Sequence, residues 1–400
     1  MKGVSWKKVE KLSFVLLSHF RFKTPTVVFK SFGGQYNDNP KYISEKLHEI
    51  RPDIRIVWIS SDKSDNSFPD YVRKIPSCGW DYINYTCRAQ VIVDNMTGIR
   101  GNTRAKYSSV YERIVKSPHQ FNVSTWHGTP IKRIGLDTKE NSGQHYFITS
   151  CDRLIAGCKY TEEKLQQAFF PLSVQAIGTP RNDILVANLP NEQKQQIKFK
   201  LGLPLDKKIV LFAPTFRDSI EYSGVAQIHN LNIKRVSDSL RAKFGGEWVF
   251  VFRVHHEVLK KINTRHIAEQ YPGLVYDGNL HDDMAEYLAV TDALITDYSG
   301  SIFDYALTGK PGFLYTPDKD YYINEERGTY ISLDELPYPH AVELDDFYRL
   351  IENYDEKTAI QRITEFNQRI GNVETGHAAE TIARAIIKFI ETQKKENLLQ

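Results

Sequence analysis

The stretch that decides how this chain is expected to fold is Ser124-Thr125-Trp126-His127-Gly128-Thr129-Pro130-Ile131-Lys132-Arg133. It predicts the end of a strand that starts at Phe121, a histidine at the strand's carboxyl tip, a glycine turn, and a helix that Thr129 caps and Pro130 begins. In an open α/β sheet, ligands bind beyond the carboxyl ends of the strands, and a helix N-terminus can hold an anion. The stretch alone fits a capped turn with an incidental histidine equally well.

The sequence before this stretch alternates between strand and helix patterns. Apolar runs predict buried strands at residues 26–32, 54–60 and 91–95. A helix is predicted over residues 39–50, and the alternation at βαβ spacing indicates a parallel, doubly wound sheet. Gly33 and Gly34 follow the first strand without forming a dinucleotide-binding fingerprint. They predict either a close backbone approach to a ligand or a plain turn.

The same alternation continues to the end of the chain. The further predicted strands are residues 153–156, 174–177, 208–214, 248–254, 274–276, 293–296 and 312–315. Residues 188–205 are polar with prolines near both ends, which indicates a domain boundary. The fold class we predict is α/β, with two Rossmann-like doubly wound domains at residues 25–188 and 189–400 and a cleft between their strand tips. The helix at residues 378–392 is expected to pack back on the first domain.

Length and composition agree with this two-domain prediction. A chain of 400 residues exceeds what one core usually organises, and 41% hydrophobic with 25% charged residues is typical of a soluble protein. The cysteines show neither zinc-site spacing nor the density of a disulfide scaffold, which favours a reducing cytoplasm and simple core thiols. These cysteines are Cys78, Cys87, Cys151 and Cys158.

The excess of positive over negative charge lies at the N-terminus of the chain. Residues 1–23 hold six basic residues and one acidic residue, while the whole chain carries a net charge of only +3. This distribution argues against nucleic-acid binding and favours a local basic anchor. Residues 1–24 form a basic arm, and its apolar residues at helical spacing, from Trp6 to Phe20, predict an amphipathic helix that lies on a membrane surface, or alternatively on the protein itself. Neither a transmembrane helix nor a secretory signal is predicted.

A second candidate site follows the strand at residues 293–296. Ser301 and Asp304 fit a helix-capping pattern, and Gly300 lets the backbone approach a ligand closely. Free N–H groups together with the hydroxyls of Ser299 and Ser301 suit a phosphate or diphosphate. The segment therefore predicts a capped helix start that also binds phosphate.

Histidine and arginine side chains follow other predicted strands. His255 and His256 are neighbours on a strand and point to opposite faces, so they are not expected to chelate one metal ion. Arg253 would share a face with His255 and hold anionic oxygens, and Arg217 and Arg181 follow strand tips near the expected diphosphate. No Walker loop, G-x-S-x-G or H-E-x-x-H motif is present. These absences disfavour a hydrolase or a kinase. The remaining interpretation is an enzyme that transfers a group from an activated anionic donor.

An ordered set of motifs now resembles the CDP-glycerol glycerophosphotransferase family, whose members make bacterial teichoic acids and capsules. The matching segments are residues 31–40, 126–137, 178–183, 213–217, 253–255, 296–305 and 327–330. The resemblance implies a GT-B fold, an acceptor bound mainly by the first domain, and a CDP-linked donor bound by the second. It also implies two catalytic histidines, His127 and His255. The chain departs from the family pattern at Gly300, where a second serine is expected.

From the motifs and the resemblance together, we predict the site residues by role. The donor-binding residues are Arg217, Arg253, Thr296, Asp297, Ser299, Gly300, Ser301, Asp304 and Arg327. The acceptor-binding residues are Gly33, Gly34, Gly128, Thr129 and Lys132. Arg181 and Asp183 are expected elsewhere in the cleft, and no metal-binding residues are predicted.

The resemblance further implies transfer of glycerol phosphate, or another polyol phosphate, to a hydroxyl of an undecaprenyl-linked saccharide or polymer, with release of CMP. The enzyme would act at the cytoplasmic face of the cell membrane as a peripheral protein. CDP-glycerol and CDP-ribitol both stay open as donors, as does a Mg²⁺ ion accompanying the diphosphate. Two rivals remain: a GT-B glycosyltransferase that uses a nucleotide sugar, and a non-catalytic binding member of a cell-wall synthesis complex.

Overall fold

The computed structural model describes residues 16–17, 19–60, 62, 64–96, 119–138, 151–169, 173–215, 231–254, 264–326 and 328–399. The chain forms two compact units. Unit 1 consists of Met1–Gly128, Gly135–Asp183 and Val373–Gln400, and unit 2 consists of Thr129–Ile134 and Ile184–Asn372. The stretch around His127 is therefore divided: His127 and Gly128 belong to unit 1, and the six residues after them belong to unit 2.

Unit 1 is built on a parallel sheet whose order, over the described residues, is β3-β2-β1-β4-β5-β6-β7. Its strands are β1 (Thr26–Lys30), β2 (Arg55–Ile59), β3 (Val72–Ile75), β4 (Val91–Asp94), β5 (Phe121–Ser124), β6 (Arg153–Ala156) and β7 (Val174–Ala176). The strand order reverses between β1 and β4, which makes their carboxyl ends a topological switch point. The edge strand β3 was not predicted, because Arg73 and Lys74 at its centre break the apolar pattern.

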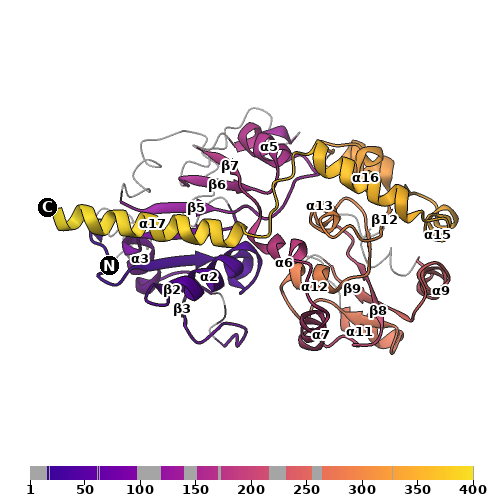
Figure 1. The fold of residues 1–400 in the computed structure, drawn as a ribbon, viewed down its shortest axis with the longest axis horizontal. Coiled ribbons are helices and arrows are strands. Elements are labelled where there is room, and N and C mark those ends of the chain that lie inside the picture. Colours follow the sequence, from indigo (N-terminus) through magenta and orange to yellow (C-terminus); the bar gives the residue numbers. More distant parts are fainter. Residues whose placement is uncertain are drawn as a thin grey trace, which may run out of the picture. The chain divides into compact units, whose positions relative to one another are not determined.

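Helices cover both faces of this sheet. They are α2 (Asp38–Ile50), α3 (Trp80–Arg88), α5 (Lys159–Phe169) and α17 (Ala378–Leu399), with the 3₁₀ turns η1 (Phe32–Gly34), η2 (Gly135–Asp137) and η4 (Pro180–Asn182) and the short α6 (Asp183–Val186). Alternate strand residues face opposite sides. Val27 and Trp58 pack with Ile386 of α17, whereas Val28 and Val57 lie in a separate cluster with Tyr85 of α3. The helix α17 runs beside α2 (Figure 1).

The N-terminal arm lies mostly outside the described residues. Leu16 and Leu17 are helical, whereas Phe20, the last residue of the predicted apolar stripe, is not. Within the described part of the chain, no helix is both long and apolar enough to cross a bilayer. The prediction of core thiols was wrong for Cys78, which is exposed, while the other cysteines are buried.

Unit 2 repeats the architecture with a second parallel sheet, ordered β10-β9-β8-β11-β12-β13 over the described residues. Its strands are β8 (Lys208–Phe212), β9 (Trp248–Phe252), β10 (Val275–Asp277), β11 (Ala293–Thr296), β12 (Gly312–Tyr315) and β13 (His340–Ala341). The order reverses between β8 and β11, so the switch point lies at the carboxyl ends of these two strands. The strand β13 has only two residues and was not predicted.

Unit 2 also has helices on both faces. They are α7 (Asn191–Lys200), α9 (Ile233–Phe244), α11 (Thr264–Gln270), α12 (Met284–Val290), α13 (Ser301–Ala306), α14 (Lys319–Tyr321), α15 (Leu344–Glu352) and α16 (Glu356–Arg369). Residues of α9, α11 and α15 share one buried cluster with the strands, including Leu240, Ile267 and Phe347. This second parallel sheet confirms the α/β class with two sheet domains predicted from the sequence.

The helix predicted to begin at Thr129 and Pro130 does not form. Residues 129–134 contain no helix, and Lys132 instead makes an antiparallel β-bridge with Thr329 of the same unit. The Tyr330 N–H donates to the Ile131 carbonyl oxygen over 2.8 Å. Because these backbone groups bond to another chain segment, the residues stay extended instead of turning into a helix. We call residues 129–134 the docked segment.

Candidate active site

His127 lies in unit 1, just beyond the carboxyl end of β5. Its Nδ1 is 2.9 Å from the carbonyl oxygen of Asn95, which follows β4. A carbonyl oxygen only accepts hydrogen bonds, so Nδ1 carries the proton and Nε2 keeps the lone pair. Nε2 makes no hydrogen bond with the described residues, and His127 is exposed. The imidazole is therefore held in the tautomer that can accept a proton at Nε2.

The surroundings of His127 keep the ring neutral. The residue retains open surface, but the protein atoms packed around it remove part of its hydration, and this loss lowers the pKa of the imidazole. The bond to Asn95 and the charge of Asp38 oppose the decrease, whereas the positive charge of Arg181 adds to it. A lowered pKa leaves the ring unprotonated at neutral pH, as a general base requires.

Polar residues at the ends of neighbouring strands surround His127. Asn95 donates through Nδ2 to Asp38 Oδ2 over 2.6 Å and to Ser31 Oγ over 3.1 Å. Arg181 donates through Nη1 to Asp38 Oδ1 over 2.7 Å and to the His127 carbonyl oxygen over 3.0 Å. Sequence reasoning missed Asp38 and Asn95, although polar residues at strand ends were a signal that could have found them.

Two residues of this network have an unusual backbone. Trp126 and Asp38 have φ angles of 52° and 57°. In the left-handed region, a residue other than glycine costs about 1–3 kcal/mol, and such strain often accompanies functional sites. Asn39 Nδ2 donates to the Trp126 carbonyl oxygen over 3.2 Å and helps to hold the strained turn. The loop that carries His127 is thus fixed by several independent bonds.

The glycines predicted to bind the acceptor are required for two different reasons: some adopt a positive φ angle, and one leaves room for a neighbouring side chain. Gly33 and Gly34, in η1, have positive φ angles of 66° and 79°. Gly128 has a φ of 134°, and a Cβ there would lie 2.8 Å from Arg181 Nη2. A side chain at position 128 would therefore push away the guanidinium that binds the His127 carbonyl. The glycines shape the strand tips through their backbone.

Most of the motif at residues 178–183 binds the C-terminal segment of the chain, which belongs to unit 1 from Val373 onward. Asp183 accepts from the N–H groups of Ala378 and Ala379 over 2.9 and 2.8 Å, so both of its oxygens cap α17. Its observed bonds are thus structural, and its place in the cleft stays a prediction. The carboxylate of Glu374 accepts from the Thr179 N–H over 2.8 Å. Arg181 is the member of this motif that reaches His127.

In unit 2, Thr296 and Asp297 join the tips of β11 and β8. Asp297 is fully buried, and its two oxygens accept from the Thr215 N–H over 2.9 and 3.0 Å. Thr296 Oγ1 donates to the Ala213 carbonyl oxygen over 2.6 Å. The two side chains predicted to bind the donor therefore position the backbone at the switch point of this unit.

The start of α13 differs from the predicted capping pattern. Ser301 is the first helical residue, and the N-cap is Gly300, which provides no side-chain cap. The Ser301 hydroxyl donates to Ser299 Oγ over 2.9 Å, and the Ser301 N–H contacts the same oxygen at 3.3 Å. Asp304 is buried within the helix. Ser299, rather than Ser301 with Asp304, thus supplies the oxygen at this helix start.

The docked segment brings two predicted acceptor residues into unit 2. A Cβ on Gly300 would lie 2.9 Å from the Thr129 carbonyl oxygen, and Lys132 Nζ lies 5.4 Å from the centre of the Tyr322 ring. Tyr322 stacks on Tyr298 with a centroid distance of 3.9 Å. Thr129 and Lys132 therefore lie in the same unit as the predicted donor-binding residues.

Arg253, predicted to hold anionic oxygens, bonds to protein carbonyls instead. Its Nη1 donates to the oxygens of Gly278 and His281, the latter over 2.6 Å, and its Nη2 donates to Asp282 over 2.8 Å. Burial lowers the pKa of its guanidinium. Arg253 therefore holds the loop after β10 in place through these hydrogen bonds. Its binding of anionic oxygens stays a prediction. The predicted residues Arg217, His255, His256 and Arg327 lie outside the described residues.

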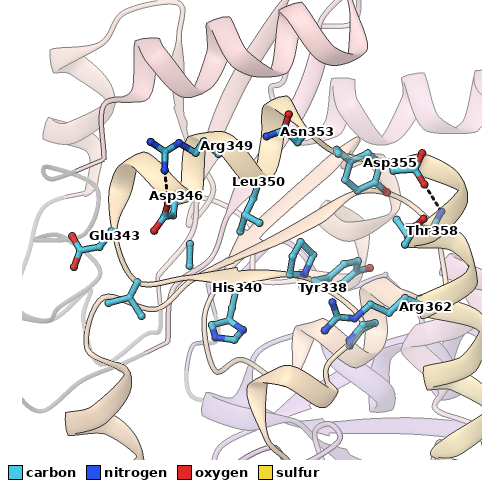
Figure 2. A pocket seen from close by; sticks show the side chains of 16 residues that line it. Tyr338, His340, Glu343, Asp346, Arg349, Leu350, Asn353, Asp355, Thr358 and Arg362 are labelled. Carbon is cyan, nitrogen blue, oxygen red and sulfur yellow. Dashed lines mark hydrogen bonds and ion pairs between the residues drawn. The ribbon is translucent and has the colours of Figure 1, made fainter.

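Unit 2 also has a cavity of about 710 Å³ along its edge strand β13 (Figure 2). His340, Arg349 and Arg362 are among its lining side chains, together with Tyr338 and Asp355. The strands β11 and β12 separate it from the tip of β8, and it contains no predicted site residue. The polar groups at the strand tips, rather than this cavity, identify the candidate site. Within the described residues, no His, Cys, Asp and Glu cluster could hold a metal ion.

Two parallel α/β units, one with a base-competent histidine at its strand tips, define a two-domain α/β protein with a GT-B-like fold. The chain belongs to the CDP-glycerol:poly(glycerophosphate) glycerophosphotransferase family, whose model matches residues 12–388. It is 30% identical over 392 residues to a teichoic acid poly(glycerol phosphate) polymerase of Staphylococcus epidermidis, covering 93% of this chain and 52% of the polymerase. It is also 30% identical to a teichoic acid glycerol-phosphate transferase of Staphylococcus aureus, covering 94% of this chain and 96% of that protein.

The fold matches solved structures of the same family. The wall teichoic acid polymerase TagF superposes with a TM-score of 0.76 at 27% identity, over 97% of this chain and 95% of the TagF chain. A TagF variant soaked with CDPG matches with a TM-score of 0.74 at 26% identity, over the same shares of the two chains. The chain spans about half the length of the Staphylococcus epidermidis polymerase, with 52% of that protein covered.

Proposed function

We propose that this chain transfers a polyol phosphate from a CDP-linked donor to a hydroxyl group of a lipid-linked acceptor in teichoic acid or capsule synthesis. The acceptor oxygen attacks the phosphorus that carries the polyol, the P–O bond within the diphosphate breaks, and CMP leaves. The acceptor proton passes to a base. The observation that carries the proposal is His127, whose Nδ1 is bound to the Asn95 carbonyl while Nε2 stays available.

Glycerol phosphate from CDP-glycerol is our first choice of transferred group. Family membership and the glycerol-phosphate relatives support it. A ribitol-phosphate polymerase of Bacillus spizizenii is also similar, 32% identical over 216 residues, so CDP-ribitol remains the second donor to test. A Mg²⁺ ion would arrive with the donor's diphosphate, and chelation by EDTA tests the need for it.

We assign donor binding to unit 2 and acceptor binding to unit 1. In unit 2, the hydroxyls of Ser299 and Ser301 lie at the start of α13, directly after the β11 tip. His255, Arg217 and Arg327 would add a catalytic imidazole and cations for the phosphates, as the family resemblance implies. In unit 1, His127 would take the acceptor proton.

The acceptor we propose is an undecaprenyl-linked saccharide or polymer, used at the cytoplasmic face of the cell membrane. The basic arm at residues 1–23 supports a peripheral contact with anionic lipids. Sedimentation with anionic vesicles, before and after deletion of residues 1–22, tests this contact. Undiminished binding of the shortened chain would remove the arm from the proposal.

One assay separates the proposed reaction from its rivals. Purified full chain is given CDP-glycerol, CDP-ribitol or nucleotide sugars with a lipid-like acceptor, and CMP release is measured. We expect CMP from a CDP-polyol only when the acceptor is present. Turnover of nucleotide sugars alone would indicate a glycosyltransferase, and donor binding without any turnover would indicate a non-catalytic binding member.

A further inference from the structure

We propose that Asp38 and Arg181 form a positioning pair for His127, which holds the imidazole on the Asn95 carbonyl and keeps Nε2 as its basic nitrogen. The proposal rests on the proposed function of His127 as the base. Asp38 is the centre of the arrangement, because each of its oxygens binds a different partner: Oδ2 accepts from Asn95 and Oδ1 accepts from Arg181. Both partners bind His127.

The first connection runs from Asp38 through Asn95 to the ring of His127. A carboxylate only accepts hydrogen bonds, so the amide nitrogen of Asn95 must face Asp38, at 2.6 Å. The same nitrogen donates to Ser31 Oγ, and Asn95 is completely buried. These bonds fix the residue whose carbonyl oxygen accepts from Nδ1 of His127. Asp38 therefore acts on the imidazole at one remove.

The second connection runs from Asp38 through Arg181 to the backbone of His127. One guanidinium nitrogen, Nη1, contacts both the Asp38 carboxylate at 2.7 Å and the His127 carbonyl oxygen at 3.0 Å. The Arg181 N–H donates to Asn39 Oδ1 over 3.0 Å, which fixes the arginine at its own backbone. Only a residue without a side chain at position 128 leaves room for this guanidinium. The ring and the main chain of His127 are thus held through one carboxylate.

The Arg181–Asp38 ion pair is largely shielded from water, so its loss should have a measurable effect. The side chains of Arg181 and Asp38 are 13% and 15% exposed, whereas the ion pairs Lys46–Glu49 and Lys159–Glu162 each have one partner that is more than 60% exposed. Removal of one member of a shielded ion pair costs much more free energy than removal of one member of a surface pair. Asp38, at the start of α2, and Arg181, in η4, are the charged groups among the described residues that act on the imidazole of His127, and they act in opposite directions.

This opposition gives a test that loss of folding alone cannot imitate. Without the negative charge of Asp38, the imidazolium loses its favourable neighbour, so Asp38→Asn lowers the pKa of His127 further. Without the positive charge of Arg181, the imidazolium loses an unfavourable neighbour, so Arg181→Gln raises that pKa. Arg181→Lys keeps the charge but not the planar guanidinium that holds Nη1 between the two oxygens, so it lowers turnover and leaves the pKa of His127 near the wild-type value.

The decisive experiment is a pH titration of ¹⁵N-histidine-labelled full chain by long-range ¹H–¹⁵N NMR, with His127 assigned by His127→Gln. We expect protonated Nδ1 in the wild type and opposite pKa shifts in Asp38→Asn and Arg181→Gln. In parallel, kcat/KM should fall by roughly 100-fold in both variants, since a displacement of about 1 Å has that effect. Its acid limb should move to lower pH in Asp38→Asn and to higher pH in Arg181→Gln.

Arg51→Gln is the matched control, because it breaks an ion pair at the other end of α2, where Arg51 binds Asp53 over 2.7 Å. It should change neither the titration nor the pH profile. Shifts of the same sign, no shifts, or a protonated Nε2 in the wild type would each overturn the proposal. If Asp38→Asn fails to fold by circular dichroism, the two Arg181 variants decide. Absence of CMP release by the wild type rejects the proposed reaction, whereas the NMR titration still tests the positioning pair.

Discussion

The carbonyl oxygen of Thr129 lies 2.9 Å from the place that a Cβ on Gly300 would occupy. Gly300 has an ordinary helical φ of −59°, so the close approach of the docked segment, and not backbone conformation, requires glycine there. This contact leaves no room for a residue larger than glycine at position 300. A serine in place of Gly300 would bring its Cβ against the Thr129 carbonyl.

Gly300→Ala should therefore destabilise the protein and release the docked segment. Forcing an extra carbon into a close contact typically costs about 1–3 kcal/mol. We expect a lower melting temperature by circular dichroism and slower CMP release. Ser299→Ala, the neighbouring substitution, removes a hydroxyl without adding an atom to this contact, and it serves as the control for the melting temperature alone because Ser299 belongs to the proposed donor site. An unchanged melting temperature for Gly300→Ala would show that the segment is not held there.

The sequence predicted the sheets better than the turns. Long apolar runs such as residues 208–212 and 248–252 form parallel strands because a strand covered on both faces needs apolar residues throughout. The edge strands β3 and β13 escaped prediction, since β3 has exposed polar residues and β13 is very short. An apolar run in the sequence indicates a buried strand, and neither of these edge strands contains such a run.

The turns failed for a different reason. Thr129 and Pro130 have the local chemistry of a helix start, but the backbone bonds to residues 328–330, almost 200 positions later, hold the segment extended. Ser301 likewise looks like a cap in sequence and is the first residue of the helix itself. His127 was found because it stands at a strand tip. Its supporting residue Asp38 was missed because its partners are distant in sequence.

His127→Ala should abolish most of the activity while leaving the donor bound. Loss of a general base typically reduces turnover by roughly 100-fold or more. We expect this decrease in CMP release, together with an almost unchanged dissociation constant for CDP-glycerol by calorimetry. His266→Ala removes a surface imidazole that is 67% exposed and should have wild-type kinetics. Wild-type turnover of His127→Ala would exclude His127 as the base.

Asp183→Ala should affect stability far more than catalysis. The substitution removes the carboxylate that accepts from the Ala378 and Ala379 N–H groups, and the loss of a helix cap costs about 0.5–2 kcal/mol. The expected result is a lower midpoint of urea unfolding with a nearly normal kcat at low denaturant. Arg181→Gln, two residues earlier, should by contrast lower kcat/KM by roughly 100-fold, because it removes a contact to His127. A strong decrease in kcat without a change in unfolding would instead support the predicted place of Asp183 in the cleft.

Asp94→Asn should stabilise the protein at alkaline pH and have a smaller effect at acidic pH. Burial raises the pKa of the Asp94 carboxyl to about 6, above the usual value near 4, so the folded state favours the protonated form. The resulting stability is present below about pH 4 and is lost as the pH rises through about 6. Asparagine cannot ionise, so the variant should gain up to roughly 3 kcal/mol relative to the wild type at pH 8, with a smaller difference at pH 4. Urea unfolding at both pH values measures this, with Asp345→Asn, 71% exposed, as the control. A difference that does not change with pH would mean that folding leaves the pKa of Asp94 unchanged.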